Sequence, residues 1–153
     1  MVYLYYAKAK TEHEEIKPEY IVKDVSVCKK NSVYLNRIDY VWHLITLGKY
    51  KKIVVLNKDN RVVHTSCVVG KCFKFPFLSK SSAEIGPCAT HSDFRGMGIY
   101  PMVLNYIRSI GEYTDYYMLV RSDNTASIRG IEKAGFLRIG TVEKRRGRWI
   151  RTL

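Results

Sequence analysis

The chain has 153 residues, with 26 Lys and Arg against 14 Asp and Glu, so its formal net charge is +12. Its hydrophobic content of 46% excludes a disordered chain, and no apolar run approaches the roughly 18 residues of a membrane-spanning helix. Because the first residues also lack the basic leader of a signal peptide, we expect one cytoplasmic domain over residues 1–153, without a membrane partner and biased towards anionic ligands.

The N-terminal third of the chain predicts two strands and one helix. Val2–Tyr6 and Ile21–Val27 are apolar runs that indicate strands. Asp39–Tyr50 has helical spacing, with Asp39 as its cap and Gly48 at its end. Apolar residues share one face of this helix, namely Tyr40, Val41, Leu44 and Ile45.

A hairpin and an irregular strand follow. Ile53–Leu56 and Val62–Val69 are β-branched runs on either side of a turn at 58–60, whose Asp and Asn suit a tight turn. After a loop over Phe73–Ser82, Ala83–Thr90 predicts another strand. Its Gly86-Pro87 pair weakens strand pairing and indicates a bulge or an open strand edge.

The second half alternates helices with strands. A helix is predicted from about Tyr100 to Ile110, followed by a buried strand at Tyr116–Val120. Thr125–Ala134 predicts a second helix, capped by Asp123 or Asn124 and stopped by Gly135, and Phe136–Leu153 predicts a final hairpin that turns near Arg146-Gly147-Arg148. The order of elements predicts an α/β fold with a mixed sheet.

The four cysteines are Cys28, Cys67, Cys72 and Cys88. They are scattered, and they form neither a close pair nor a Cys/His cluster with the spacing of a zinc finger. A domain of this size needs no disulfide to hold its core, so we expect reduced thiols and no metal site.

The stretch THSDFRGMGIYPMVL, residues 90–104, holds the clearest sign of chemistry. Gly96 and Gly98 precede a helix whose first turn tolerates Pro101. Such a turn exposes backbone N–H groups at the positive end of a helix, and Arg95 adds a permanent charge, so the stretch predicts an anion cradle. A plain loop-to-helix turn, with glycine serving only the backbone, is the alternative.

Two familiar phosphate loops do not fit this stretch. A P-loop needs Gly-Lys-Ser/Thr, which does not occur in the chain. A dinucleotide fingerprint needs a third glycine where Pro101 stands, and His91–Phe94 separate the turn from the strand before it.

The stretch instead resembles motif A of the GNAT superfamily, the acyl-CoA-dependent N-acetyltransferases. That motif reads Arg/Gln-x-x-Gly-x-Gly/Ala and opens a long helix after a bulged strand, which Arg95–Tyr100 matches except at Tyr100, where a small residue is usual. Asn124–Ser127 and Glu132–Phe136 resemble motif B, in family order around a strand. The resemblance covers the chain from about Lys52 to the C-terminus.

The resemblance implies a fold and a cosubstrate. The expected fold is a mixed, mostly antiparallel twisted sheet with a central splayed strand pair, flanked by helices. Acetyl-CoA would enter the splay with its pyrophosphate on the glycine turn and its pantetheine arm along the strand that holds Cys88. The implied cofactor-binding residues are Cys88, Thr90, Arg95, Gly96, Met97, Gly98, Ile99, Tyr100, Asn124, Ser127 and Lys133.

The implied reaction is direct attack of an amine on the thioester in a ternary complex. An alkyl amine has a pKa of about 10.4, so a general base is expected. Glu84 is the first candidate, because several family members use a glutamate at a similar point, and His91 is the second, because imidazole titrates near neutrality. A surface carboxylate and a capping histidine are the structural alternatives.

The leaving group has no obvious acid. Many relatives carry a tyrosine where this chain has Ile131, so Tyr100, Tyr116 or Tyr117 would have to replace it, or the thiol, with a pKa of about 8.5, would leave unaided. Cys88 as a nucleophile that accepts the acyl group is a weaker alternative than Cys88 as a small buried thiol.

The acceptor is less defined than the cosubstrate. The net charge favours a small anionic amine over a basic protein, and a basic cluster lies near the tail at Lys144, Arg145, Arg146, Arg148 and Arg151. A fainter resemblance to small bacterial acetyltransferases found with surface-polysaccharide genes points to a nucleotide-linked amino sugar; nucleic acid is less favoured. A non-catalytic acyl-CoA-binding or basic nucleic-acid-binding module is the alternative function. The oligomeric state is open, with a homodimer as one option.

Overall fold

The computed structural model describes residues 1–13, 15–28 and 32–152. The predicted strands and helices all form, and Leu153 at the end of the predicted tail lies outside the described residues. The strands are β1 (Val2–Lys8), β2 (Ile21–Val25), β3 (Tyr50–Leu56), β4 (Val62–Gly70), β5 (Ser82–Thr90), β6 (Asp115–Arg121), β7 (Leu137–Arg145) and β8 (Arg148–Thr152). The helices are α1 (Arg37–Ile45), α2 (Ile99–Ile110) and α3 (Thr125–Lys133), with short 3-10 turns at Ser32–Tyr34 and Ser92–Phe94.

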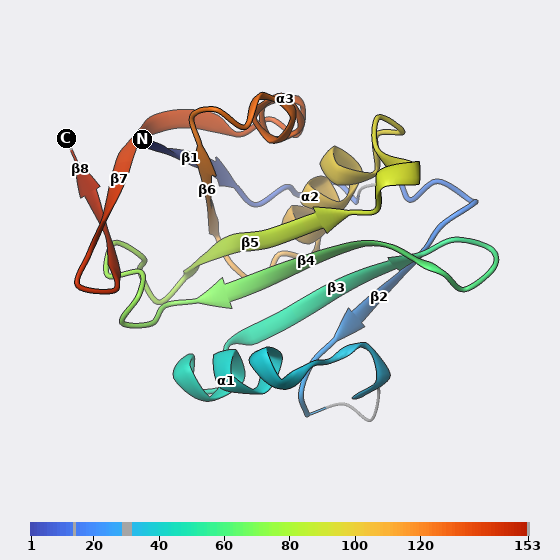
Figure 1. The fold of residues 1–153 in the computed structure, drawn as a ribbon, viewed down its shortest axis with the longest axis horizontal. Helices are drawn as coiled ribbons and strands as arrows, with labels where there is room; N and C mark the ends of the chain where they lie inside the picture. The colour runs from blue at the N-terminus through green and yellow to red at the C-terminus, as the bar shows by residue number, and fades with distance from the viewer. Residues whose placement is uncertain (14, 29–31, 153) are drawn as a thin grey trace.

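The strands form one open sheet in the order β2-β3-β4-β5-β6-β1-β7-β8. All neighbours are antiparallel except β5 and β6, which run parallel. Their pairing is limited to Ser82–Glu84 against Asp115–Tyr117, and beyond it the two strands diverge, as Figure 1 shows. The predicted fold, with its splayed central pair, is therefore confirmed.

A bulge in β5 coincides with this divergence. Ser66 of β4 pairs with Cys88 and Val68 pairs with Ile85, so Gly86 and Pro87 together oppose the single residue Cys67. A bulge of this kind bends the strand that carries the extra residue. The predicted irregularity at Gly86-Pro87 is thus the point at which β5 turns away from β6.

Different elements pack on the two faces of the sheet. On one face, α2 buries Met102, Val103 and Ile107, and α3 buries Ile131, in the largest hydrophobic cluster. On the other face, α1 contributes Trp42, and the loop after β4 contributes Phe75, to a smaller cluster. None of the helices in the described chain is long and apolar enough to cross a membrane.

Helix α1 differs from its prediction. Its N-cap is Asn36, and Asp39 is instead the third helical residue, which closes a capping box and is buried beside Tyr50 and Lys52. The helix ends at Ile45 rather than near Gly48, because Leu47 and Gly48 both take positive φ. The predicted apolar face also points outwards for the most part, since the side chains of Tyr40, Val41 and Leu44 are exposed.

Candidate functional site

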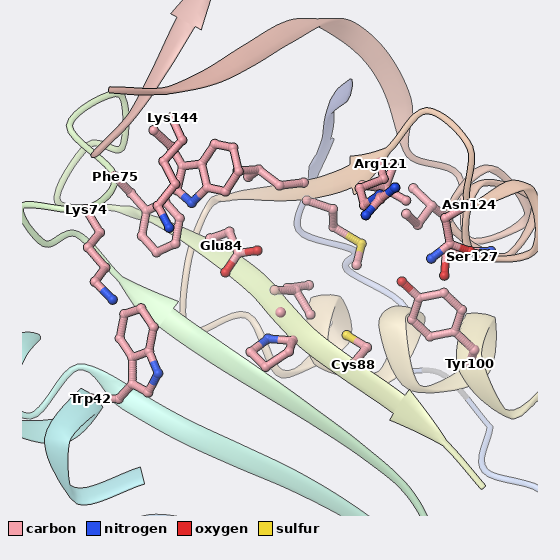
Figure 2. Close-up of a pocket in the computed structure, with 18 of the residues that line it drawn as sticks. Trp42, Lys74, Phe75, Glu84, Cys88, Tyr100, Arg121, Asn124, Ser127 and Lys144 are labelled. Atoms are coloured by element: carbon pink, nitrogen blue, oxygen red, sulfur yellow. Dashed lines mark hydrogen bonds between the residues drawn. The ribbon is translucent and has the colours of Figure 1, made fainter. Parts of the chain in front are cut away.

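Two cavities meet where β5 and β6 diverge. One, of about 510 Å³, is bordered by the middle of β5 and β6, by α1 and by the β7–β8 hairpin. The other, of about 590 Å³, lies between the end of β5, the start of α2 and α3. Residues that line both are Cys88, Tyr100, Asn124 and Ser127, so the cavities adjoin one another (Figure 2).

The glycine turn forms one wall of the 590 Å³ cavity. Gly96 and Gly98 each have a φ of +76°, in the region that favours glycine, and Gly98 is the N-cap of α2. Within the described chain, the backbone N–H groups of residues 96–100 donate to no protein acceptor. These groups lie at the positive end of a 12-residue helix, so the turn can bind an anion.

Lys17, which the sequence analysis did not consider, fixes part of this turn. Its Nζ donates a hydrogen bond of 2.7 Å to the carbonyl oxygen of Met97. The C=O and N–H of a trans peptide point in opposite directions, so the Gly98 N–H faces away from Lys17. The loop before β2 thereby holds one donor of the cradle in a set direction.

Cations surround the same cavity. Arg95, Arg129 and Lys133 line it, and the Arg95 Nε donates a hydrogen bond of 3.1 Å to the Thr90 carbonyl. Met97 differs from the other predicted cofactor residues, since its side chain is exposed and outside the lining, which leaves only its backbone N–H. The predicted residues that line the cavity are Cys88, Thr90, Arg95, Gly96, Gly98, Ile99, Tyr100, Asn124, Ser127 and Lys133.

Tyr100, where a small residue was expected, packs against α3. A Cβ placed on Gly130 would lie 2.5 Å from the Tyr100 Cδ1, so the ring rests directly on the glycine backbone. On the other side the Tyr100 ring lies 5.8 Å from the ring of His64. The ring therefore occupies space between α2, α3 and β4, while the Tyr100 backbone N–H stays in the cradle.

A chain of polar side chains runs behind Tyr100. His64 Nδ1 lies 2.7 Å from Thr90 Oγ1, and its Nε2 lies 2.7 Å from Ser66 Oγ. The Cys88 thiol is within hydrogen-bonding reach of the hydroxyls of Ser66 and Tyr100. Burial lowers the pKa of His64 to about 4 and raises the pKa of Cys88 to about 12, so a neutral imidazole and a protonated thiol are expected at pH 7.

Glu84, the first candidate base, lines the 510 Å³ cavity. The residue is 6% exposed and lines the cavity, and Figure 2 shows its carboxylate in the space between β5 and the β7–β8 hairpin. No donor in the described chain forms a hydrogen bond with this carboxylate. Desolvation by burial raises its pKa to about 8.

Gly86 makes room for this carboxylate. A Cβ on Gly86 would lie 2.6 Å from Glu84 Oε1, closer than two such atoms can approach. The bulge thus has two effects. It coincides with the opening of the sheet, and Gly86, which has no side chain, leaves space for the carboxylate of Glu84.

His91, the second candidate base, lies outside both sets of lining residues. Its Nδ1 accepts a hydrogen bond from the Asp93 N–H at the 3-10 turn, and its Nε2 is 2.8 Å from an Arg61 nitrogen. The structure therefore places His91 as a cap beside the glycine turn, and Glu84 is the candidate base that faces a cavity.

The structure also distinguishes among the candidate acids. The Tyr116 hydroxyl donates to the carbonyl of Ile107 in the core, and Tyr117 packs on Phe77. Tyr100 is the tyrosine that lines both cavities, and Ile131 lines the one with Glu84.

The walls of the 510 Å³ cavity were mostly missed by the sequence analysis. Trp42 stacks on Phe75, with ring centroids 6.3 Å apart, and Lys74 Nζ lies 4.4 Å from the centroid of the Trp42 ring. The β7–β8 hairpin adds Lys144 and Trp149. Lys144 belongs to the basic cluster noted near the tail, but no local pattern connects it with α1 or with the loop after β4.

The fold is similar to several solved structures, although no protein-family model and no curated protein matches the sequence. A conserved protein of unknown function from Staphylococcus epidermidis aligns over 90% of this chain with 13% identity and a TM-score of 0.63. A putative GNAT-family acetyltransferase from Novosphingobium aromaticivorans aligns over 90% with 16% identity and a TM-score of 0.55. This chain spans 57% and 59% of the lengths of those two chains.

A third similar structure has nearly the same length as this chain. The spermidine N-acetyltransferase from Vibrio cholerae, solved with CoA and spermine, aligns over 89% of both chains with 12% identity and a TM-score of 0.60. At these identities the similarity establishes the fold alone. The chain has the GNAT fold, as its motifs predicted.

Proposed function

We propose that the protein is an acetyl-CoA-dependent N-acetyltransferase acting on a primary amine of a small acceptor. The observation that carries the proposal is the position of Glu84, a buried carboxylate without a hydrogen-bond partner among the described residues, in a cavity that adjoins an anion cradle. The GNAT fold supports this reading, since similar structures are named as acetyltransferases.

The residues of the 590 Å³ cavity fit coenzyme A. The backbone N–H groups of residues 96–100, which have no acceptor in the part of the chain that the structure describes, would bind its pyrophosphate. Arg129 and Lys133 would neutralise the remaining phosphate charge. Because β5 pairs with β6 only as far as Glu84, the edge at Cys88–Thr90 is open to an extended pantetheine arm.

The chain's own groups then account for the chemistry. Glu84 takes the proton of the attacking amine as nitrogen bonds to the thioester carbon, and the C–S bond breaks to release the thiol of coenzyme A. A backbone N–H on the open edge of β5 would stabilise the negative charge that develops on the carbonyl oxygen. Tyr100 is the tyrosine nearest to both cavities and the proposed acid for the leaving thiolate.

For the acceptor we propose a nucleotide-linked amino sugar, the class implied by the fainter resemblance to acetyltransferases found with surface-polysaccharide genes. Trp42, Phe75 and Trp149 give the 510 Å³ cavity flat apolar walls on which a sugar ring can pack. The cavity adjoins the open edge of β5, which would bring the amine of a bound sugar beside Glu84.

The test measures release of the CoA thiol from acetyl-CoA with a panel of amines, for the wild type and for Glu84→Gln. We expect thiol release with at least one amine, and a fall in kcat of about 100-fold or more in the variant, the scale on which general bases act. The affinity for coenzyme A, measured by calorimetry, should not change. Glu12→Gln, an exposed carboxylate, is the control.

Tight binding of coenzyme A without thiol release in the presence of any amine would contradict the proposed enzyme activity and favour an acyl-CoA-binding module. Strong, steeply salt-dependent binding of nucleic acid would favour a basic nucleic-acid-binding module instead. Unchanged turnover of Glu84→Gln at every pH would remove Glu84 from the mechanism.

A further inference from the structure

The 510 Å³ cavity carries more positive charge than a site for a basic acceptor should. Its described lining contains three cations, Lys74, Arg121 and Lys144, and a single carboxylate, Glu84. Arg121 is paired with Asp123 at 2.6 Å. Lys74 and Lys144 form no ion pair with any carboxylate of the described chain, so two positive charges are not neutralised.

A side-chain contact places the Lys74 ammonium group, and the backbone register of the β7–β8 hairpin places Lys144. Lys74 lies over the Trp42 ring, and its carbonyl accepts a hydrogen bond of 2.8 Å from the Trp149 N–H. That bond ties the loop after β4 to the β7–β8 hairpin, in which Lys144 pairs directly with Trp149. Figure 2 shows Lys74 and Lys144 towards one side of the cavity, with Tyr100, Asn124 and Ser127 on the other and Glu84 between them.

This arrangement is unsuited to a polyamine. A polyamine brings several ammonium groups, and each needs a carboxylate or another acceptor when it leaves water. The described lining offers one carboxylate, and two unpaired lysines would repel the substrate. The chain therefore shares a fold with the spermidine N-acetyltransferase, but the described lining of this cavity lacks the carboxylates that would select such an acceptor.

The same lysines are suited to a phosphate. An ammonium group forms strong charge-assisted hydrogen bonds with phosphate oxygens. We propose that Lys74 and Lys144 form a subsite for a phosphate of the acceptor, which holds the acceptor's amine towards Glu84 while its ring packs on Trp149. The inference rests on the proposed function, because it assigns the acceptor end of that site. A sugar phosphate and the diphosphate of a nucleotide share this chemistry.

Two tryptophans allow the subsite to be tested without turnover. The chain contains only Trp42 and Trp149, and both line this cavity. With the other cavity saturated by coenzyme A, a change in tryptophan fluorescence on addition of uridine diphosphate or glucosamine 1-phosphate would report binding at the subsite. We expect saturable binding by the wild type, and at least about 10-fold weaker binding by the Lys74→Gln/Lys144→Gln variant. Lys58→Gln, in the β3–β4 turn, is the matched control.

Kinetics give the second readout. We expect KM for glucosamine 1-phosphate or uridine diphosphate glucosamine to be about 10-fold lower than for glucosamine, and to rise in the double variant with little change in kcat. KM for glucosamine should change much less than KM for the phosphorylated acceptors, and the Lys58→Gln control should change neither. The better of the two phosphorylated acceptors identifies the source of the phosphate.

Equal KM values with and without phosphate, or a preference for spermidine, would overturn the subsite while leaving the acetyltransferase intact. Absence of thiol release with every amine would instead overturn the proposed function, and the fluorescence titration would still decide whether the lysines bind phosphate. Equal binding by the wild type and the double variant would contradict the proposal directly.

Discussion

At the scale of single residues, the surroundings of Glu84 set its proton affinity. The side chain is 6% exposed, rests on Gly86 and has no hydrogen-bond donor in the described chain, so burial penalises its ionised form. A general base works best when its pKa lies close to the pH at which the reaction runs. Burial alone thus changes an ordinary carboxyl group into a candidate base near neutrality.

The pH dependence of the reaction should follow this residue. Burial raises the pKa of Glu84 to about 8, and only the ionised carboxylate accepts a proton, so kcat/KM should rise with pH and level off above about 8. The measurement is kcat/KM from pH 6 to 9.5 for the wild type and Glu84→Gln. The variant retains the titration of the amine but should lose the inflection near pH 8. An identical profile in the two proteins would contradict the assignment.

The same burial should destabilise the fold at high pH. The unfolded glutamate ionises near its ordinary value of 4.5 and the folded one near 8, so between these values the folded state holds one proton more. Stability from this group is therefore present below about pH 4.5 and is lost as pH rises to about 8.

We expect Glu84→Gln to raise Tm more at pH 8 than at pH 5. Each kcal/mol gained in the free energy of unfolding should raise Tm by about 2–4 °C. Thermal unfolding at the two pH values, with Glu12→Gln as the exposed control, measures the difference. His64, whose pKa is lowered to about 4, contributes equally to both proteins and cancels. A gain that does not depend on pH would show that Glu84 ionises normally.

At the scale of elements, small residues decide how the strands and helices meet. Gly86 and Pro87 in β5 stand opposite one residue of β4, and this mismatch precedes the divergence from β6. In α3, Gly130 lets the Tyr100 ring of α2 lie against the helix backbone. A helix interior normally disfavours glycine, so a packing requirement explains its presence at 130.

Gly130→Ala tests that contact. Helix propensity alone would make alanine stabilising by about 1 kcal/mol. The new Cβ would instead lie 2.5 Å from Tyr100 Cδ1, so the ring must move within the cavity that it lines. We expect a lower Tm and a several-fold weaker affinity for coenzyme A, measured by calorimetry.

The double variant Gly130→Ala/Tyr100→Ala is the control for this prediction, since removal of the ring removes the collision. We expect the Tm of this double variant to be no lower than the Tm of Tyr100→Ala alone, because alanine at position 130 then meets no ring. A stabilised Gly130→Ala single variant would show that the helix and the ring are not in contact.

At the scale of the whole molecule, the net charge of +12 acts on both cavities. Arg95, Arg129 and Lys133 border one, and Lys74 and Lys144 border the other. A positive field of this kind attracts anionic ligands before contact and is screened by salt. Both the proposed cosubstrate and the proposed acceptor are anionic, so their binding should weaken together as ionic strength rises.

A salt series separates this effect from the chemistry. Between about 50 and 500 mM NaCl, we expect KM for acetyl-CoA and for a phosphorylated amino sugar to rise several-fold, while kcat stays nearly constant. KM for unphosphorylated glucosamine should change much less. A uniform change in all three constants would indicate a general effect of salt on the fold instead.

The strands, the helices and the glycine turn that we propose for the cofactor could be predicted from the sequence, because each depends on residues close together in the chain. The β-branched runs, the Gly86-Pro87 irregularity and the glycine turn before Pro101 each carry a local physical requirement, and the structure contains the predicted element in each case. Glu84 was identified on the same strand by resemblance, but its burial could not be read from alternating residues.

The cavity that we propose for the acceptor could be found only in the folded chain. Trp42, Lys74 and Trp149 come from a helix, a loop and a hairpin that are brought together by sheet pairing and by the bond from Trp149 to Lys74. The cap of α1 and its exposed apolar face were mispredicted for the same reason, since packing rather than periodicity decides which side of a short helix is covered. Residues distant in sequence meet only when the chain is folded, and the charge and shape of the acceptor cavity come from such meetings.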